Sequence, residues 1–316
     1  MFLCISANPA IDKRMRVARL LVGQVNRASA VQPNPGGKAA HVAMVLRALE
    51  ADPLWIGFAG GASGMELDAG LREIGIRTHP VTMAESTREN LEILDGSGGV
   101  TEILEPGGAP TKQEVLAFQA RCETEFAAGG EKQIVIISGS LPPGMEADWY
   151  SWLIREAHAR GCTVFLDTSG EALRSGLAAG PDFVKPNRHE AEELTGIQIT
   201  DSPSARNALH RVIQAGAKSA AISLGENGLV YCSGSKGEIY FARPPKVNVK
   251  STVGCGDATV AGFAYAAHAN LPAREAVLLA AACGTANCLA DAPGRVSLSD
   301  IQAFQIEMQI EEARKA

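Results

Sequence analysis

The stretch Ser251-Thr252-Val253-Gly254-Cys255-Gly256-Asp257 runs directly into residues 258–269, which are uncharged, small and apolar. This pattern predicts a glycine-rich turn at the start of a buried helix. Backbone N–H groups at such a turn point outward with the positive end of the helix dipole behind them, and they bind phosphate oxygens. The Asp257 carboxylate could accept a proton from an attacking hydroxyl group, so the stretch indicates phosphoryl transfer. An ordinary N-cap aspartate preceded by glycines would give the same local pattern.

Short apolar runs alternate with longer amphipathic segments throughout the chain. Such alternation predicts β-α-β units, that is, an α/β fold with a mostly parallel sheet and helices on both faces. The expected strands are residues 2–7, 54–58, 134–138, 163–167, 183–185, 220–224 and 229–232. The expected helices are residues 38–50, 64–74, 112–127, 147–160, 190–195, 204–215, 257–269, 273–290 and 299–314.

Two stretches interrupt this alternation, at about 12–33 and 86–105. The first has a period of two without a helical pattern, and the second predicts a hairpin around a turn at residues 96–99. Strands of this kind would form a small sheet beside the main one. A sheet over the edge of an α/β core would act as a lid that excludes water from the reaction. We therefore expect one domain over residues 1–316, with a lid formed by these two stretches.

Composition excludes several classes of protein. The chain has 316 residues, 46% of them hydrophobic, and a net charge of −6, whereas nucleic-acid binders usually carry a basic face. The longest uncharged stretches, residues 258–273 and 276–287, are too short to span a membrane. The 7 cysteines are odd in number and form no Cys-x-x-Cys pair, which argues against a disulfide framework or a zinc site. With no signal-peptide pattern at the start, we expect a cytoplasmic location.

A second glycine-rich motif, Asn34-Pro35-Gly36-Gly37-Lys38-Ala39-Ala40-His41, leads into an apolar helix. It has the spacing neither of a dinucleotide fingerprint nor of a Walker A loop. The glycines would let a substrate approach the backbone, with Lys38 as a charge for an anion. The alternative is a plain helix start with a solvated lysine.

The motif Lys185-Pro186-Asn187-Arg188-His189-Glu190 follows an expected strand, where open α/β sheets bind ligands. Asn187 and Glu190 would lie on one side of a turn, and their oxygens could hold the water shell of a Mg²⁺ ion. A capping box with Asn187 as N-cap and Glu190 at position N3 explains the same pattern, and both interpretations can hold.

Three other features also point to the ligand edge of the sheet. The glycines of Ser223-Leu224-Gly225-Glu226-Asn227-Gly228 would free backbone donors for a nucleotide phosphate, or form a hairpin turn. Asp12 could bind sugar hydroxyls and Arg88 could clamp a phosphate, although each is also typical of a surface charge. Small-residue loops follow the strands that end at Ser138 and Asp167.

Together these motifs, in this order, resemble those of the PfkB (ribokinase-like) carbohydrate kinases from end to end. Residues 254–257 resemble the family's Gly-Ala-Gly-Asp signature, Asn187 with Glu190 its Asn-x-x-Glu motif, and Gly36-Gly37-Lys38 its N-terminal Gly-Gly signature. Within the family, Asn8-Pro9-Ala10-Ile11-Asp12 and Thr87-Arg88-Glu89-Asn90 resemble the phosphofructokinase and tagatose-6-phosphate kinase branch.

The resemblance implies a ribokinase-like three-layer α/β/α core with a mostly parallel sheet and a small β-sheet lid. It also implies a kinase that uses ATP and Mg²⁺ to phosphorylate the primary hydroxyl of a ketohexose phosphate. Fructose 1-phosphate is the favoured acceptor, and tagatose-6-phosphate kinase, 6-phosphofructokinase and a non-catalytic sugar-phosphate sensor are alternatives. A homodimer through the lid strands is expected, with no nucleic-acid or membrane partner. An NAD-dependent dehydrogenase is excluded because the dinucleotide fingerprint is missing.

The resemblance assigns roles to individual residues. Asp257 is the base, and the N–H groups of Gly254, Cys255 and Gly256 stabilise the transferred phosphoryl group. The ATP-binding residues are Lys185, Asn187, Ser223, Gly225 and Gly228, and the Mg²⁺ ion is held through water by Asn187 and Glu190. The substrate-binding residues are Asp12, Gly37, Lys38, His41, Arg88 and Ser138.

Three residues depart from the family pattern. His41 stands where the family usually has an asparagine that touches the sugar, which affects hydroxyl specificity. Cys255 replaces the usual alanine or serine in the anion site, and its thiol could make the protein sensitive to oxidants. Gln24 stands where 6-phosphofructokinases tend to have a lysine, which argues against that activity.

Overall fold

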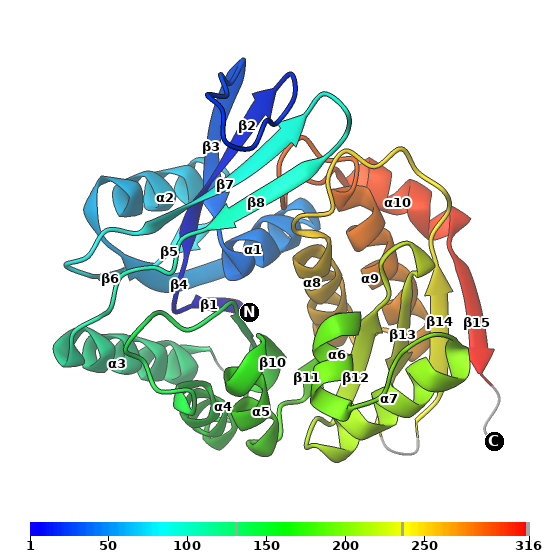
Figure 1. The fold of residues 1–316 in the computed structure, drawn as a ribbon. Helices are drawn as coiled ribbons and strands as arrows, with labels where there is room; N and C mark the ends of the chain where they lie inside the picture. The colour runs from blue at the N-terminus through cyan, green and yellow to red at the C-terminus, as the bar shows by residue number, and fades with distance from the viewer. Residues whose placement is uncertain (130–131, 235–236, 314–316) are drawn as a thin grey trace.

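The computed structural model describes residues 1–129, 132–234 and 237–313 (Figure 1). An 11-stranded sheet forms its centre, in the order β15-β14-β13-β12-β11-β10-β9-β1-β4-β5, with β6 paired to β4. The strands are β1 Phe2–Ser6, β4 Pro53–Ala59, β5 Arg77–Thr78, β6 Val81–Thr82, β9 Ile134–Ser138, β10 Thr163–Asp167, β11 Phe183–Val184, β12 Ser219–Ser223, β13 Leu229–Cys232, β14 Ile239–Arg243 and β15 Gln309–Ala313. From β5 through β4, β1, β9, β10 and β11 to β12, neighbouring strands pair in parallel, as β6 does with β4. From β12 through β13 and β14 to β15, neighbouring strands are antiparallel. The expected α/β class with a mostly parallel sheet is confirmed.

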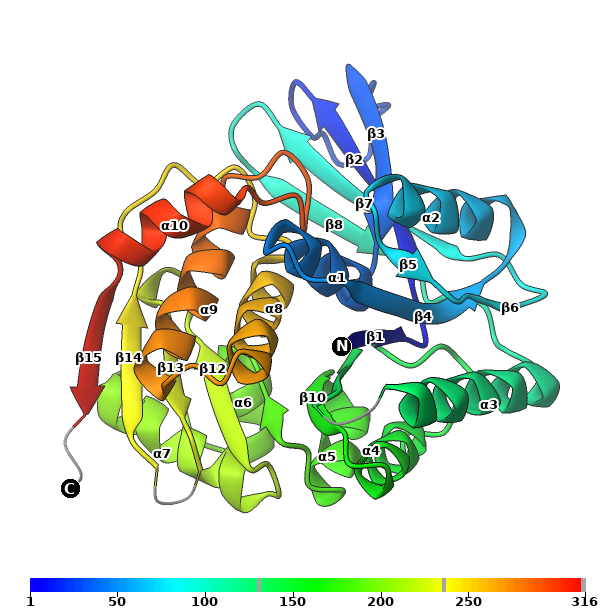
Figure 2. The same ribbon diagram turned by 180° about the vertical axis from the view of Figure 1, so that it is seen from behind.

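Helices cover both faces of the sheet, so the core has three layers (Figures 1 and 2). One face carries α1 Lys38–Ala48, α2 Gly61–Glu73, α8 Cys255–His268, α9 Ala273–Asn287 and α10 Leu298–Glu307. The other carries α3 Lys112–Ala128, α4 Trp149–Ala159, α5 Gly170–Ala178, α6 Arg188–Thr195 and α7 Ser202–Gln214. None of the helices among the described residues is long and apolar enough to cross a bilayer.

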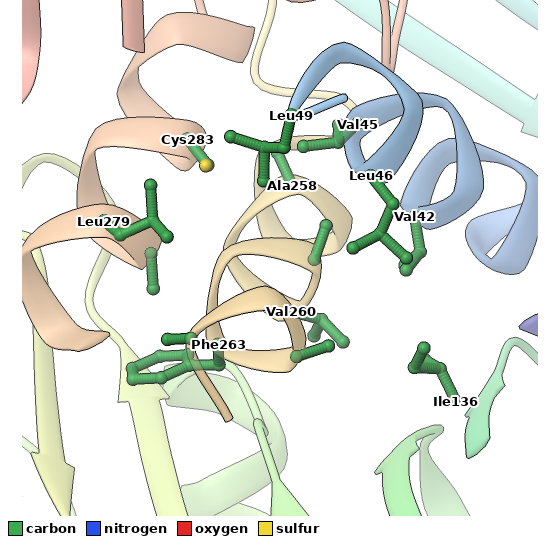
Figure 3. Close-up of a cluster of buried hydrophobic side chains, with 14 of the residues drawn as sticks. Val42, Val45, Leu46, Leu49, Ile136, Ala258, Val260, Phe263, Leu279 and Cys283 are labelled. Carbon is green, nitrogen blue, oxygen red and sulfur yellow. The ribbon is translucent and has the colours of Figure 1, made fainter. Parts of the chain in front are cut away.

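The central strands are buried on both sides, which explains why their sequences are continuous apolar runs. In β1, Phe2 and Cys4 face one hydrophobic core, and Leu3 and Ile5 face the other. Figure 3 shows part of the first core, where side chains of α1, α8 and α9 meet above β9. Burying a large apolar side chain of this kind contributes roughly 1.5–3 kcal/mol. These contacts fix α1 and α8 side by side, and the two helices carry the glycine-rich motifs at their N-termini.

A separate four-stranded sheet lies beside α1, in the order β3-β2-β7-β8 (Figure 1, top). Its strands are β2 Ala10–Val17, β3 Ala30–Gly36, β7 Arg88–Asp95 and β8 Val100–Leu104. These strands overlap the two stretches that interrupt the α/β alternation of the sequence, with β2 beginning at Ala10 and β3 continuing to Gly36, slightly beyond the expected limits. The β7–β8 pair is the hairpin that was expected around residues 96–99.

The helix expected at 299–314 is wrong in its second half. Helix α10 ends at Glu307, Met308 is extended, and Gln309–Ala313 form β15 along β14. The sequence of this segment favours a helix locally, but β14 offers an open edge whose backbone groups need partners, and pairing with that edge prevails. Residue 314 lies outside the described residues. Helix α5 and the strands β5, β6 and β14 were not expected at all.

A buried ion pair joins the four-stranded sheet to the segment that precedes α8. Arg14 of β2 donates two hydrogen bonds to Glu92 of β7, from Nε to Oε2 at 2.7 Å and from Nη2 to Oε1 at 2.8 Å. Both side chains are almost fully buried. Glu92 Oε1 also accepts a hydrogen bond from Ser251 Oγ at 2.6 Å, and Arg14 donates another to the carbonyl oxygen of Asp291. The cluster therefore holds the sheet against the loop that leads into the Gly254 turn.

Replacing Arg14 by methionine would leave the Glu92 carboxylate buried without its cation. We expect Arg14→Met to lower the free energy of unfolding by about 3–5 kcal/mol, as for other broken buried ion pairs. Urea unfolding measures the loss. Lys13→Met on the same strand is the control, because its partner Glu89 and Lys13 itself are both partly exposed, and such pairs contribute less than about 1 kcal/mol. Equal losses in the two variants would contradict the prediction.

Candidate active site

One large cavity lies between the four-stranded sheet and the edge of the main sheet where β10, β11 and β12 end. Its volume of about 1660 Å³ exceeds the roughly 300–1,000 Å³ of a pocket for one small molecule, so it has room for two ligands. The candidate residues that line it are Asp12, Gly37, Lys38, His41, Arg88, Lys185, Asn187, Glu190, Ser223, Gly225, Gly228, Gly254, Cys255, Gly256 and Asp257. The structure therefore brings together all the residues proposed from the sequence except Ser138.

Helix α8 begins at the cavity wall. Its N-cap, Gly254, has φ 80° and ψ −6°, a left-handed conformation that favours glycine, and a Cβ atom there would lie 2.9 Å from Pro293 Cβ. The first N–H groups of a helix have no partner within the helix, so this end presents donors and a positive dipole to the cavity. The Cys255 N–H also makes a long hydrogen bond of 3.3 Å to the Thr252 carbonyl oxygen. Asp257 lies in the first turn and is buried.

The imidazole of His41 lies between two carboxylates. Its Nδ1 is 2.8 Å from Asp257 Oδ2, and its Nε2 is 2.9 Å from Asp12 Oδ2. The contact with Asp12 deviates from the angle of an ideal hydrogen bond. Burial alone would lower the pKa of His41, but the hydrogen bonds and charges of Asp12 and Asp257 outweigh it and raise the pKa to about 10. His41 is therefore an imidazolium that holds both carboxylates at neutral pH.

Asp12 is held from three sides. Besides His41, its carboxylate accepts a hydrogen bond from Asn90 Nδ2 at 2.9 Å and another from the backbone N–H of Gly37. Burial alone would raise the pKa of Asp12, but these partners lower it below its ordinary value. A Cβ atom on Gly36 would come within 2.3 Å of Asp12 Cγ, so the first glycine of the Gly-Gly motif makes room for this carboxylate.

A second charged group is centred on Asp167, which ends β10. Its carboxylate lies 3.3 Å from Lys38 Nζ and 3.8 Å from Lys185 Nζ, and it accepts a hydrogen bond from Ser138 Oγ at 3.1 Å. Burial would raise the pKa of Asp167, but the two lysines lower it. Ser138 therefore contacts Asp167 rather than the cavity. The sequence placed Asp167 at the ligand edge but gave it no role, and its position as the last residue of an expected strand was the available signal.

The motif at residues 185–190 forms the expected capping box. Asn187 Oδ1 accepts a hydrogen bond from the Glu190 N–H at 2.9 Å, and Glu190 Oε2 accepts one from the Asn187 N–H at 2.8 Å. Both side chains also line the cavity, so capping does not remove them from it. Within the described ranges, no group of three or more His, Cys, Asp or Glu side chains is arranged to hold a metal ion directly.

The hairpin interpretation of residues 223–228 is confirmed. The turn Gly225–Asn227 joins the antiparallel strands β12 and β13, and Gly225 and Gly228 both have positive φ. The same turn borders the cavity. Opposite it, α9 contributes lining residues that the sequence did not single out, namely Ala281, Gly284, Thr285 and, just beyond the helix, Cys288. Small side chains facing a cavity carry no motif, which is why they were missed.

Arg88 begins β7 and reaches the cavity from the four-stranded sheet. Its guanidinium donates hydrogen bonds to the backbone carbonyl oxygens of Glu105 at 2.8 Å and Asn8 at 3.1 Å. Partial burial lowers its pKa, although nearby carboxylates oppose this effect. The two carbonyl groups fix the orientation of the side chain, and Arg88 and Lys38 supply positive charge to the end of the cavity that holds Asp12.

A helix N-terminus suited to an anion lies beside a buried carboxylate, in a cavity large enough for two ligands on an α/β/α core, and this is the arrangement expected of a sugar kinase. Residues 5–297 match the pfkB family carbohydrate kinase profile, and the chain belongs to that family. The expected family is thereby confirmed.

The chain is also similar to individual proteins of known sequence or structure. It is 36% identical over 266 residues to a 1-phosphofructokinase of Xanthomonas campestris, covering 83% of this chain and 82% of the other. It is 30% identical over 294 residues to a 1-phosphofructokinase of Bacillus subtilis, covering 93% and 94%. The crystal structure of Escherichia coli phosphofructokinase-2 in complex with fructose-6-phosphate matches with a TM-score of 0.88 at 28% identity, covering 97% and 98%.

The raised pKa of His41 predicts a pH dependence of stability. The pKa is 6.5 for an unperturbed histidine and about 10 in the folded protein, so the imidazolium contributes fully below pH 6.5. This contribution is lost as the pH rises through 10. We therefore expect the difference in unfolding free energy between the wild type and His41→Asn to shrink from pH 6.5 to pH 10.

Urea unfolding of both proteins across this pH range gives the difference, and groups that titrate in both cancel. His189→Asn, at a side chain that is 80% exposed, is the matched control for the loss of an imidazole. A difference between wild type and His41→Asn that stays constant with pH would show that His41 is not held as a cation.

Proposed function

We propose that this protein is an ATP-dependent kinase that phosphorylates the primary hydroxyl of fructose 1-phosphate to give fructose 1,6-bisphosphate. The observation that carries the proposal is the position of Asp257, which lies in the first turn of α8 and is joined through His41 to Asp12. The residues proposed as base, as phosphate-binding donors and as sugar-binding carboxylate all line one cavity, which supports the proposal. The relatives named 1-phosphofructokinase support fructose 1-phosphate as the acceptor.

In the proposed reaction, Asp257 takes the proton of the sugar hydroxyl while the hydroxyl oxygen attacks the γ-phosphorus of ATP. The bond to the oxygen that bridges the β- and γ-phosphates breaks, and ADP leaves. The N–H groups of Gly254, Cys255 and Gly256 stabilise the charge on the transferred group. Lys185 is well placed to stabilise the same charge, because its Nζ lies close to this turn: a Cβ atom on Gly256 would be only 3.1 Å from it. His41 orients Asp257 and, as a wall residue of the cavity, also faces the sugar.

The two ends of the cavity bind different ligands in this proposal. ATP lies along the edge formed by Lys185, Asn187, Ser223, Gly225 and Gly228. Asn187 and Glu190 would hold the waters of a Mg²⁺ ion, which would neutralise phosphate charge. The sugar phosphate lies against Asp12, Gly37, Lys38, His41 and Arg88. Ser138 acts on this end indirectly, through its hydrogen bond to Asp167.

The substrate is tested by a coupled assay of ADP release with Mg·ATP. The acceptors are fructose 1-phosphate, fructose 6-phosphate, tagatose 6-phosphate, fructose and ribose. We expect a clear preference for fructose 1-phosphate. Asp257→Asn should lower this turnover by at least about 100-fold while ATP still binds, as for the loss of a general base.

Each other outcome of the assay has a distinct meaning. Preference for fructose 6-phosphate would favour 6-phosphofructokinase activity, the second candidate, because the structurally similar E. coli phosphofructokinase-2 was crystallised with that sugar. Turnover of a free sugar alone would remove Lys38 and Arg88 from phosphate binding. Turnover by Asp257→Asn within a few-fold of the wild type would remove Asp257 from the mechanism.

We also propose that residues 1–316 form a single kinase domain in which the four-stranded sheet is a lid. Asn90, Glu102 and Leu104 of this sheet line the cavity, which supports a role in closing it. The proposed location is the cytoplasm, in keeping with the free cysteines of the described residues.

We propose a homodimer through the lid. The sheet exposes large apolar side chains, including Val31 at 50%, Ile103 at 53% and Leu104 at 60% exposure, and a second copy of the sheet would cover them.

Light scattering coupled to size-exclusion chromatography tests the dimer. The wild type should have the mass of a dimer, and Ile103→Lys should shift it towards the monomer because a charge would be buried at the contact. Leu116→Lys is the control, since Leu116 is 63% exposed on α3, away from the four-stranded sheet. A wild type that is monomeric at micromolar concentration would reject the proposed interface.

A further inference from the structure

Two cysteine side chains are in contact at the start of α8. Cys255 is the first residue of that helix and Cys288 directly follows α9, and their Sγ atoms are 3.2 Å apart. Both residues line the cavity and are partly exposed, whereas the other five cysteines are buried. The contact therefore combines two features that thiol oxidation needs, proximity of a second sulfur and access for a small oxidant.

The contact favours ionisation of one of the two thiols, Cys288. The hydrogen bond from Cys255 lowers the pKa of the Cys288 thiol, whereas the same hydrogen bond and burial raise the pKa of Cys255, so the negative charge lies on Cys288. Asn287 Nδ2 lies 3.4 Å from Cys255 Sγ, and the N-terminus of α8 adds a positive dipole. Thiolates rather than thiols react with peroxides, and a neighbouring thiol resolves the product.

The sulfurs are also close to disulfide geometry. An S–S bond is about 2.05 Å long, so the two Sγ atoms need to approach by only about 1.2 Å from their present separation. Helices α8 and α9 pack against each other, so any backbone movement that helps to close this gap falls on the helix ends rather than on their middles. The end that carries Cys255 is the first turn of α8, which also carries Gly256 and Asp257.

We propose that Cys255 and Cys288 form an intramolecular disulfide when the protein meets a hydroperoxide, and that this bond distorts the anion-binding turn. The Cys288 sulfur attacks one peroxide oxygen, the O–O bond breaks, and a sulfenic acid and hydroxide form. The Cys255 sulfur then attacks the Cys288 sulfur and the S–O bond breaks. In sum two thiols are oxidised, and one hydrogen peroxide is reduced to two waters.

The consequence for activity rests on the proposed kinase function. The Cys255 N–H belongs to the group of donors assigned to the transferred phosphoryl group, and Asp257 lies two residues further on. Losing one well-placed donor of this kind costs about 100-fold in turnover in other enzymes. The disulfide should therefore lower the rate of phosphoryl transfer by at least about tenfold, and a thiol reductant should restore it.

The bond itself is tested without any activity measurement. The full-length protein is treated with one equivalent of hydrogen peroxide, its remaining thiols are alkylated under denaturing conditions, and its peptides are analysed by mass spectrometry without reduction. We expect a linked peptide that joins Cys255 to Cys288 in the wild type. Cys283→Ala, which removes a buried thiol of α9, should still form it, and Cys288→Ala should not. Absence of the linked peptide in the wild type overturns the proposal.

The switch is tested by ADP release before and after peroxide, with each variant compared with its own untreated rate. The wild type and Cys283→Ala should lose activity and regain it with dithiothreitol, and Cys288→Ala should keep it. A linked peptide with unchanged activity would overturn the effect on the turn. If no sugar is phosphorylated at all, the proposed function fails, and the linked peptide still decides whether the disulfide forms.

Discussion

The site depends on one cation placed between two buried anions. Asp12 comes from β2 and Asp257 from α8, and two carboxylates this close would repel each other in a medium that screens charge poorly. His41 contacts both, and its proton makes the arrangement possible. The position of His41 depends in turn on α1, which packs on α8 through an apolar interface (Figure 3). The hydrophobic core therefore sets the geometry of the charged site.

Helix α1 also connects this group to the second charged group. Lys38 and His41 lie one turn apart on α1, and Lys38 reaches Asp167, which Lys185 approaches from the other side. Cations and carboxylates thus alternate across the cavity wall from Asp12 to Lys185. Each buried charge has an opposite partner, as buried charges require. Replacing His41 would take the shared cation from both Asp12 and Asp257, whereas replacing Lys38 would leave Asp167 with Lys185 alone.

Local patterns predicted the fold well where one interaction dominates. Strands β9, β10 and β13 were predicted residue for residue because their apolar runs allow no other buried element of that length. Strand β15 was missed, since its pairing depends on an open edge of β14 and not on its own residues.

The role of Asp167 and the contact between Cys255 and Cys288 were missed for a similar reason. Each joins residues that are far apart in the chain, and neither Asp167 nor Cys288 belongs to a motif. Ser138 was expected in the cavity, but the alternation of side chains along β9 turns it towards Asp167.

The position of β1 in the middle of the sheet has a consequence for how the chain folds. Phe2 pairs with Pro53 on one side and with Ile134 on the other, so the centre of the core forms only when segments distant in sequence meet. Parallel pairing of this kind is slow, because the entropy of closing long loops is lost before any contact compensates for it. Until β9 is available, β1 has a free apolar edge that could pair wrongly. Self-association of partly folded chains, more than loss of the finished fold, is therefore the main hazard that this topology creates during synthesis.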